Sequence, residues 1–156
     1  MKKTTILGNL QTNSFVLVLV LSFLLVSCQK EETDGEALKC TVVVKEGSDD
    51  NVIGKWKLVI AETTFFKPRK EDYSCREVFY TFREDGKLVI TSNHENLIGY
   101  DVGEYAFEFD KIEHEEAQYH SLKIGNGNIG CSIENNHMIL DNSPLDGPKL
   151  LLMRVE

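Results

Sequence analysis

Residues that could carry catalytic or metal chemistry are present, but they form no recognisable motif. The histidines fall in different predicted loops or strands and share no metal-ligand spacing; they are His94, His114, His120 and His137. The run Glu-His-Glu-Glu at 113–116 offers carboxylates and an imidazole, but charged residues at a hairpin tip are normally just solvated. The sequence has no Cys-x-x-Cys, no Gly-x-Ser-x-Gly and no phosphate-cradling glycine loop. We therefore expect no metal, no cofactor and no catalysis.

The cysteine with the clearest chemical context is Cys28. Lys2 and Lys3 precede an apolar run at 15–26, broken only by Ser22, and a small residue then comes before Cys28. This pattern is typical of a secretory leader, and the run is shorter than the roughly 20 residues that span a bilayer. The box Leu-Val-Ser-Cys at 25–28 resembles a bacterial lipoprotein signal. The resemblance implies cleavage before Cys28 and fatty acylation of Cys28; a soluble secreted protein cleaved elsewhere is the alternative.

Charge limits the partners. The chain has a formal net charge of −8, and loss of residues 1–27, which carry two lysines and no acid, would leave −10. Nucleic acid is excluded as a partner because binding it requires a basic surface. The same acidity argues against binding to anionic lipids through a cluster of basic residues. The membrane partner is therefore expected only through a lipid on Cys28.

The chain after Cys28 begins with a polar segment. Residues 29–50 carry seven acidic and three basic residues, a composition that favours disorder. We expect a leader at 1–27, a lipidated flexible tether at 28–51 and one folded domain at 52–156. The start of the tether, Gln-Lys-Glu-Glu at 29–32, resembles an export signal of surface lipoproteins in Gram-negative bacteria. This implies the outer membrane as the location; a periplasmic-facing anchor remains the alternative.

The other cysteines allow at most one intrachain disulfide. If Cys28 is acylated, an odd number remains: Cys40, Cys75 and Cys131. An oxidising compartment favours a bond, and the pair Cys75 with Cys131 is preferred because both lie in the predicted folded part. A pairing with Cys40, or no bond, remains open.

From residue 52 onward, apolar and polar residues alternate with the period of a β-strand. This predicts an all-β domain of about eight short strands. The predicted strands are 56–60, 75–83, 88–91, 103–109, 119–124, 129–134, 137–140 and 149–155. Residues 67–72 are predicted to form a loop because of Pro68. Sequential short strands favour an antiparallel up-and-down barrel, with an open sandwich as the alternative.

The sequence Gly54-Lys55-Trp56 in the first strand resembles the Gly-x-Trp signature of lipocalins and their short bacterial relatives. The last strand supplies Arg154, and the resemblance implies that Arg154 covers Trp56 where the barrel closes. The segments 82–88 and 146–148 also resemble bacterial lipocalin-like lipoproteins. The sequence departs from lipocalins proper because it has no Thr-Asp-Tyr motif and no C-terminal helix after the last strand.

Two non-enzymatic functions follow. Tyr80, Phe82, Tyr105 and Phe107 could line a pocket for a small apolar ligand, or they could simply fill the barrel. Core packing is the favoured role of these four side chains, whereas binding of a small apolar ligand is the leading function of the protein as a whole. In the alternative, the protein is an accessory or inhibitor module that binds another protein through the loops at 67–72, 93–100 and 141–148.

Overall fold

The computed structural model describes residues 37–64, 67–114 and 117–156, with the side chains of residues 112–119 left out. The chain divides into two units, Met1–Ala37 and Leu38–Glu156, and the second contains all the described strands. The predicted leader, Cys28 and the export-like segment lie outside the described residues.

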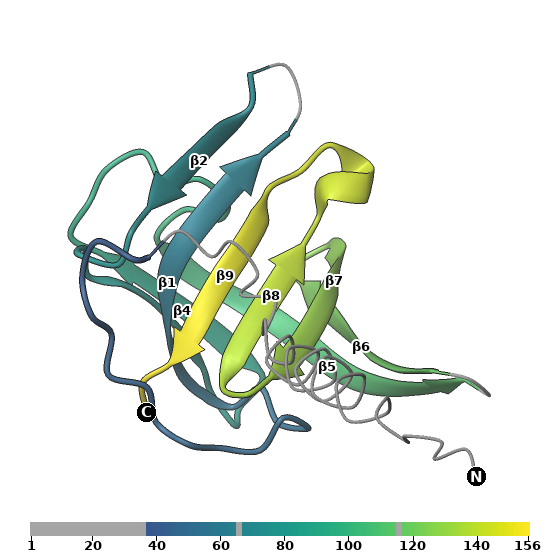
Figure 1. The fold of residues 1–156 in the computed structure, drawn as a ribbon. Helices are drawn as coiled ribbons and strands as arrows, with labels where there is room; N and C mark the ends of the chain where they lie inside the picture. Colours follow the sequence, from purple (N-terminus) through teal and green to yellow (C-terminus); the bar gives the residue numbers. More distant parts are fainter. Residues whose placement is uncertain (1–36, 65–66, 115–116) are drawn as a thin grey trace, which may run out of the picture. The chain divides into compact units, whose positions relative to one another are not determined.

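The second unit is an all-β fold (Figure 1). A short 3-10 helix, η1 (Ser143–Leu145), precedes the last strand. The strands are β1 (Gly54–Thr63), β2 (Arg69–Asp72), β3 (Val78–Phe82), β4 (Lys87–Ser92), β5 (Gly103–His114), β6 (Ala117–Ile124), β7 (Gly127–Glu134), β8 (His137–Asp141) and β9 (Lys149–Arg154).

The strands close into a barrel. Every paired neighbour is antiparallel, the sheet order is β2-β1-β3-β4-β5-β6-β7-β8-β9, and β1 also pairs with β9. The barrel therefore contains eight strands, β1 and β3 to β9, and the predicted up-and-down barrel is confirmed. Closure removes the exposed sheet edges that an open sandwich would leave.

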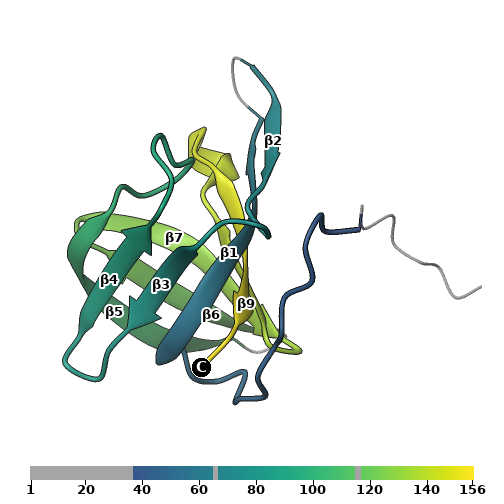
Figure 2. The same ribbon diagram turned by 90° about the vertical axis from the view of Figure 1, so that its left-hand side faces the viewer.

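β2 lies outside the closed barrel. It pairs with residues 60–63 of β1, and the two strands extend beyond the barrel wall (Figure 2). The sequence prediction of a loop at 67–72 is wrong for residues 69–72. Pro68 stands just before the strand, where a missing N–H interrupts no ladder.

Alternation of side chains builds the core. In β3, β4, β8 and β9 every second residue faces the interior and is buried. The β7–β8 hairpin turns at Asn135 and Asn136, whose φ values are 51° and 65°. Two consecutive positive φ angles are those of a type I′ turn, whose twist matches the flanking strands. The buried apolar set spans all eight barrel strands except β5, which contributes the partly buried Tyr105, Phe107 and Phe109.

Trp56 and Arg154 close the barrel at one end, called here the closed end. The two residues are paired across β1 and β9, and the Arg154 guanidinium lies 4.1 Å from the centre of the Trp56 ring. Trp56 is fully buried, and its indole N–H donates to the Val52 carbonyl at 2.8 Å. Gly54 has φ of 127°, and a Cβ there would lie 2.7 Å from the Glu156 carbonyl oxygen. These contacts confirm the closure predicted for Gly54, Trp56 and Arg154.

Residues 38–53, called here the N-terminal strap, are attached to the barrel. The backbone N–H of Lys39 donates to Asp72, and that of Cys40 donates to Ser74. Further along, the Lys45 N–H donates to the Arg154 carbonyl at 2.9 Å. The flexible tether predicted for residues 28–51 is therefore wrong from residue 38 onward. The strap is attached mainly through backbone hydrogen bonds. Amino-acid composition does not predict such bonds.

The strap also carries a disulfide. Cys40 bonds to Cys75 with a Cα–Cα distance of 5.1 Å, whereas Cys131 is a free, buried thiol. The preferred pairing of Cys75 with Cys131 is therefore wrong. Cys131 faces the core from β7, while Cys75 lies exposed on the β2–β3 connection. Burial raises the pKa of the Cys131 thiol to about 12, so that this thiol stays protonated near neutral pH.

We expect Trp56→Ala to lower the free energy of unfolding by about 3–5 kcal/mol, because a fully buried indole is replaced by a cavity. Chemical denaturation of the oxidised protein measures this change. Val43→Ala is the control: Val43 is 81% exposed on the strap, and exposed substitutions usually change stability by about 0.5 kcal/mol or less. A loss below about 1 kcal/mol for Trp56→Ala would contradict its role at the closed end.

We expect removal of the Cys40–Cys75 bond by Cys75→Ser to destabilise the protein by about 3–4 kcal/mol on the chain-entropy estimate, given the sequence separation of 35. Peptide mapping without reduction should recover Cys40 and Cys75 in one linked pair. Alkylation should reach Cys131 only after unfolding. A linked peptide containing Cys131 would show that this assignment is wrong.

Candidate functional site

The four aromatic residues predicted from the sequence differ in their surroundings. Tyr80 and Phe82 are at most 1% exposed on β3, and Tyr105 and Phe107 are partly buried on β5. The Phe82 and Phe107 rings meet edge to face at 5.0 Å between centroids. Edge-to-face packing of this kind is ordinary core packing. Phe82 and Phe107 therefore fill the interior. Tyr80 and Tyr105 differ from them because each also carries a hydroxyl group.

The Tyr80 hydroxyl is buried without a satisfying partner. No well-aligned hydrogen bond reaches it within the described residues, although the Tyr100 backbone N–H lies close enough to oppose part of the rise in its pKa. Burial raises the pKa of Tyr80 well above its usual value, so the hydroxyl is neutral and can donate. A buried polar group without a partner costs about 1–3 kcal/mol. Such a group is an exception in folded proteins and needs an explanation.

The β4–β5 loop, residues 93–102, covers this hydroxyl. Ile98 is only 8% exposed and belongs to the core cluster, while its N–H donates to the Tyr73 hydroxyl at 3.1 Å. At the next residue, Gly99 with φ of 112°, a Cβ would lie 3.0 Å from a Leu150 methyl and 3.5 Å from the Tyr80 hydroxyl. The loop thus rests directly on the barrel interior, with Ile98 as its plug.

The loops predicted for recognition gather at this end of the barrel, called here the open end. Successive strands are antiparallel, so the β1–β3 connection, the β4–β5 loop and the β8–β9 loop emerge on the same side; Figure 2 shows them together at the top. Two of the exposed large apolar residues, Val102 at 57% and Leu145 at 73%, lie on these loops. The open end therefore combines a plugged interior with a partly apolar rim.

A polar pocket of about 630 Å³ lies between β2 and the β4–β5 loop. Its lining residues are Arg69, Glu71, Arg76, Asn93, His94, Glu95 and Asn96. At its centre, the Glu71 carboxylate accepts hydrogen bonds from both Arg69 and Arg76, and His94 Nε2 lies 3.9 Å from it. Burial alone would raise the pKa of Glu71, but the Arg76 hydrogen bond and the charges of Arg69, Arg76 and His94 outweigh it and lower the pKa.

Tyr73 lies between this pocket and the plug. The Arg76 guanidinium is 5.0 Å from the centre of the Tyr73 ring, and the His94 ring meets the Tyr73 ring edge at 6.1 Å. The hydroxyl of the same tyrosine accepts the Ile98 N–H. The predicted loops 67–72 and 93–100 contain all the pocket residues except Arg76. The pairing of Glu71 with Arg76 and the position of Tyr73 were not predicted, because neither follows from alternation.

The histidines are spread over the molecule. His94 lines the pocket, His120 stacks on Phe109 at 4.9 Å, and His137 Nδ1 lies 2.9 Å from the Asn135 carbonyl oxygen. The side chain of His114 lies outside the described residues, as do those of the acidic run around it. Among the side chains that are described, no group of three His, Cys, Asp or Glu residues is arranged to hold a metal ion.

These features define a class of protein: a small, closed, antiparallel β-barrel compatible with a lipocalin-like binding module. In comparisons with known proteins, no family model, no curated protein and no solved structure matches the chain. Within the described part of the chain, no helix is long and apolar enough to cross a membrane.

Proposed function

We propose that the protein is an outer-membrane lipoprotein, anchored through Cys28, whose barrel binds a small, mainly apolar ligand at the open end without catalysis. The observation that carries the ligand proposal is the Tyr80 hydroxyl, buried without a well-aligned hydrogen bond next to Gly99 of the β4–β5 loop. The ligand would displace Ile98 and offer one polar atom to this hydroxyl.

The energetics support ligand entry at this point. Much of the interior is filled by fully buried side chains, including Trp56, Leu88 and Leu140, and a ligand cannot replace these without opening the wall. The plug is different because it lies on a loop and not on a barrel strand. That loop is held by the Ile98 N–H to Tyr73 and by the Tyr105 hydroxyl to the Asp101 carbonyl, and at its start by Asn93 with Glu77 and His94 with Ser92. An apolar ligand would substitute for the burial of Ile98, and its polar atom would remove the cost of the unpaired hydroxyl.

The location follows from the resemblance of residues 25–28 to a lipoprotein signal. From Cys28 to the first strap residue, Leu38, the chain can reach at most about 36 Å, at roughly 3.6 Å per residue. An acylated Cys28 would therefore keep the barrel close to the membrane surface. The Gln-Lys-Glu-Glu segment at 29–32 supports export to the cell surface over retention on the periplasmic side.

The ligand proposal is tested on the full chain extracted from its native membrane. Mass spectrometry of an organic extract should reveal a co-purifying small molecule. Tyr80→Phe should weaken binding of that molecule by about 2- to 12-fold, the equivalent of one hydrogen bond, while leaving the ligand-free protein as stable or more stable. Ser132→Ala is the control: it also removes a hydroxyl, but Ser132 is exposed on β7. Absence of any bound molecule, or equal affinities for Tyr80→Phe and the wild type, would defeat the proposal.

The anchor is tested separately. Cys28→Ser should leave the protein uncleaved or release it from membranes, because a thiol is needed for acylation. Fractionation of cells followed by mass measurement of the N-terminal peptide distinguishes the two results. Unchanged, cleaved and membrane-bound protein would show that Cys28 is not the anchor.

A second candidate is recognition of another protein by the open-end loops. The exposed Val102 and Leu145 favour it, because apolar side chains on loops commonly contact partners. Crosslinking on intact cells separates the two functions: a stoichiometric protein partner that is lost with Leu145→Ser would favour recognition, and its absence would favour the ligand carrier.

A further inference from the structure

The polar pocket between β2 and the β4–β5 loop has a surplus of hydrogen-bond donors. Arg69, Arg76, His94, Asn93 and Asn96 all carry N–H groups in their side chains, against the carboxylates of Glu71 and Glu95. Glu71 is already engaged by both guanidiniums. Each guanidinium has five N–H donors, so most of them remain available to a molecule in the pocket.

Glu71 also holds the two guanidiniums in place. Its side chain is only 14% exposed, whereas those of Arg69 and Arg76 are 59% and 34% exposed. The carboxylate therefore lies beneath, and the guanidiniums face solvent above it. Arg76 is fixed a second time by the Tyr73 ring at 5.0 Å. Donors fixed in advance lose little freedom on binding, which favours affinity.

We propose that this pocket is a binding site for an oxyanion group, the carboxylate or phosphate of a small molecule. Guanidinium groups present paired N–H donors that match the two oxygens of a carboxylate or phosphate. A volume of about 630 Å³ is in the range of small-molecule sites and exceeds the needs of a bare anion.

Recognition in this pocket depends on donor geometry more than on net charge. The two arginines are balanced by Glu71 and Glu95, and Glu95 is exposed at the rim. In a chain of net charge −8, long-range attraction of an anion is absent, so binding must come from close hydrogen bonds. The site is separate from the barrel interior, because β2 lies outside the closed barrel, and Tyr73 is the side chain that contacts both.

The test uses the full chain in detergent, titrated with inorganic phosphate or with acetate at constant ionic strength. NMR of the His94 ring and the arginine side chains should show saturable shifts with at least one probe. Arg69→Gln and Arg76→Gln should each weaken binding about tenfold or more. Arg76→Lys, which keeps the charge but not the paired donors, should also weaken it. Saturation by phosphate alone or by acetate alone supports the site and names the group.

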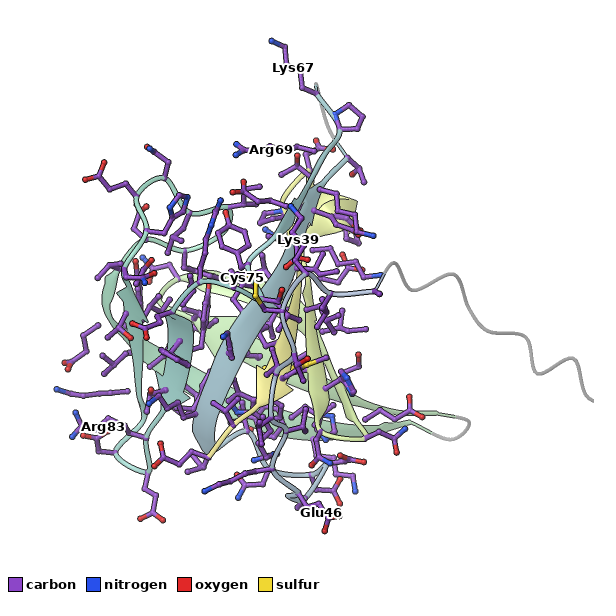
Figure 3. All side chains as sticks on the ribbon, turned by 60° about the vertical axis from the view of Figure 1, so that its left-hand side comes forward. Lys39, Glu46, Lys67, Arg69, Cys75 and Arg83 are labelled. Carbon is purple, nitrogen blue, oxygen red and sulfur yellow. A yellow bond between two sulfur atoms is a disulfide. The ribbon has the colours of Figure 1, made fainter. Side chains whose placement is uncertain are left out.

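Arg83→Gln is the matched control. Arg83 is 51% exposed and pairs with Asp85 at 2.8 Å on the β3–β4 turn, at the far end of the barrel from Arg69 (Figure 3). It should leave the affinity unchanged. If Arg76→Gln loses its fold in thermal unfolding, the more exposed Arg69→Gln decides the result. Shifts that do not saturate, or that are equal in Arg69→Gln and Arg83→Gln, would overturn the proposal.

Discussion

The structure depends on a buried guanidinium at the seam of the barrel. Arg154 is 5% exposed, and a buried charge is tolerated only where hydrogen bonds replace its water. Its two terminal nitrogens donate to the carbonyls of Ser48, Asn51 and Ile53 at 2.7–3.1 Å, all in the N-terminal strap. The seam and the strap therefore require each other: without the strap the charge is unpaired, and without the charge the strap loses its main partner.

The barrel was predictable because its signal is local. Alternation in β3, β4 and β7 places buried residues at alternate positions. The turn between β7 and β8 depends on two adjacent residues, Asn135 and Asn136. The strap was missed for the opposite reason. Its hydrogen bonds start mainly from backbone N–H groups, such as Gly47 to the Asn136 side chain at 2.8 Å, and every residue type except proline has these groups. An acidic composition therefore indicated disorder where the fold supplied partners.

The cysteines and the site show the same limit. The number of cysteines correctly predicted at most one disulfide. The pairing depends on which side of the barrel wall each cysteine occupies: Cys131 faces the inside, and Cys75 faces the outside. Alternation likewise identified Tyr80 as an inward residue. It could not identify Ile98 as the plug, or Glu71 as the centre of a pocket, because both depend on where the β4–β5 loop folds back. Loop placement is set by non-local contacts, and the sequence around each loop contains little information about them.

Each end of the barrel contains a buried polar atom that makes no hydrogen bond among the described residues: Arg154 Nε at the closed end and the Tyr80 hydroxyl at the open end. At the closed end, Trp56 and Arg154 donate from their ring and terminal nitrogens to strap carbonyls, which fixes the seam. At the open end, the Tyr80 hydroxyl lacks a hydrogen bond among the described residues, and the loop above it is held through Tyr73. Tyr73 also contacts Arg76 and His94 of the polar pocket. Tyr73 is therefore in contact both with the residues of the polar pocket and with the loop that carries Ile98.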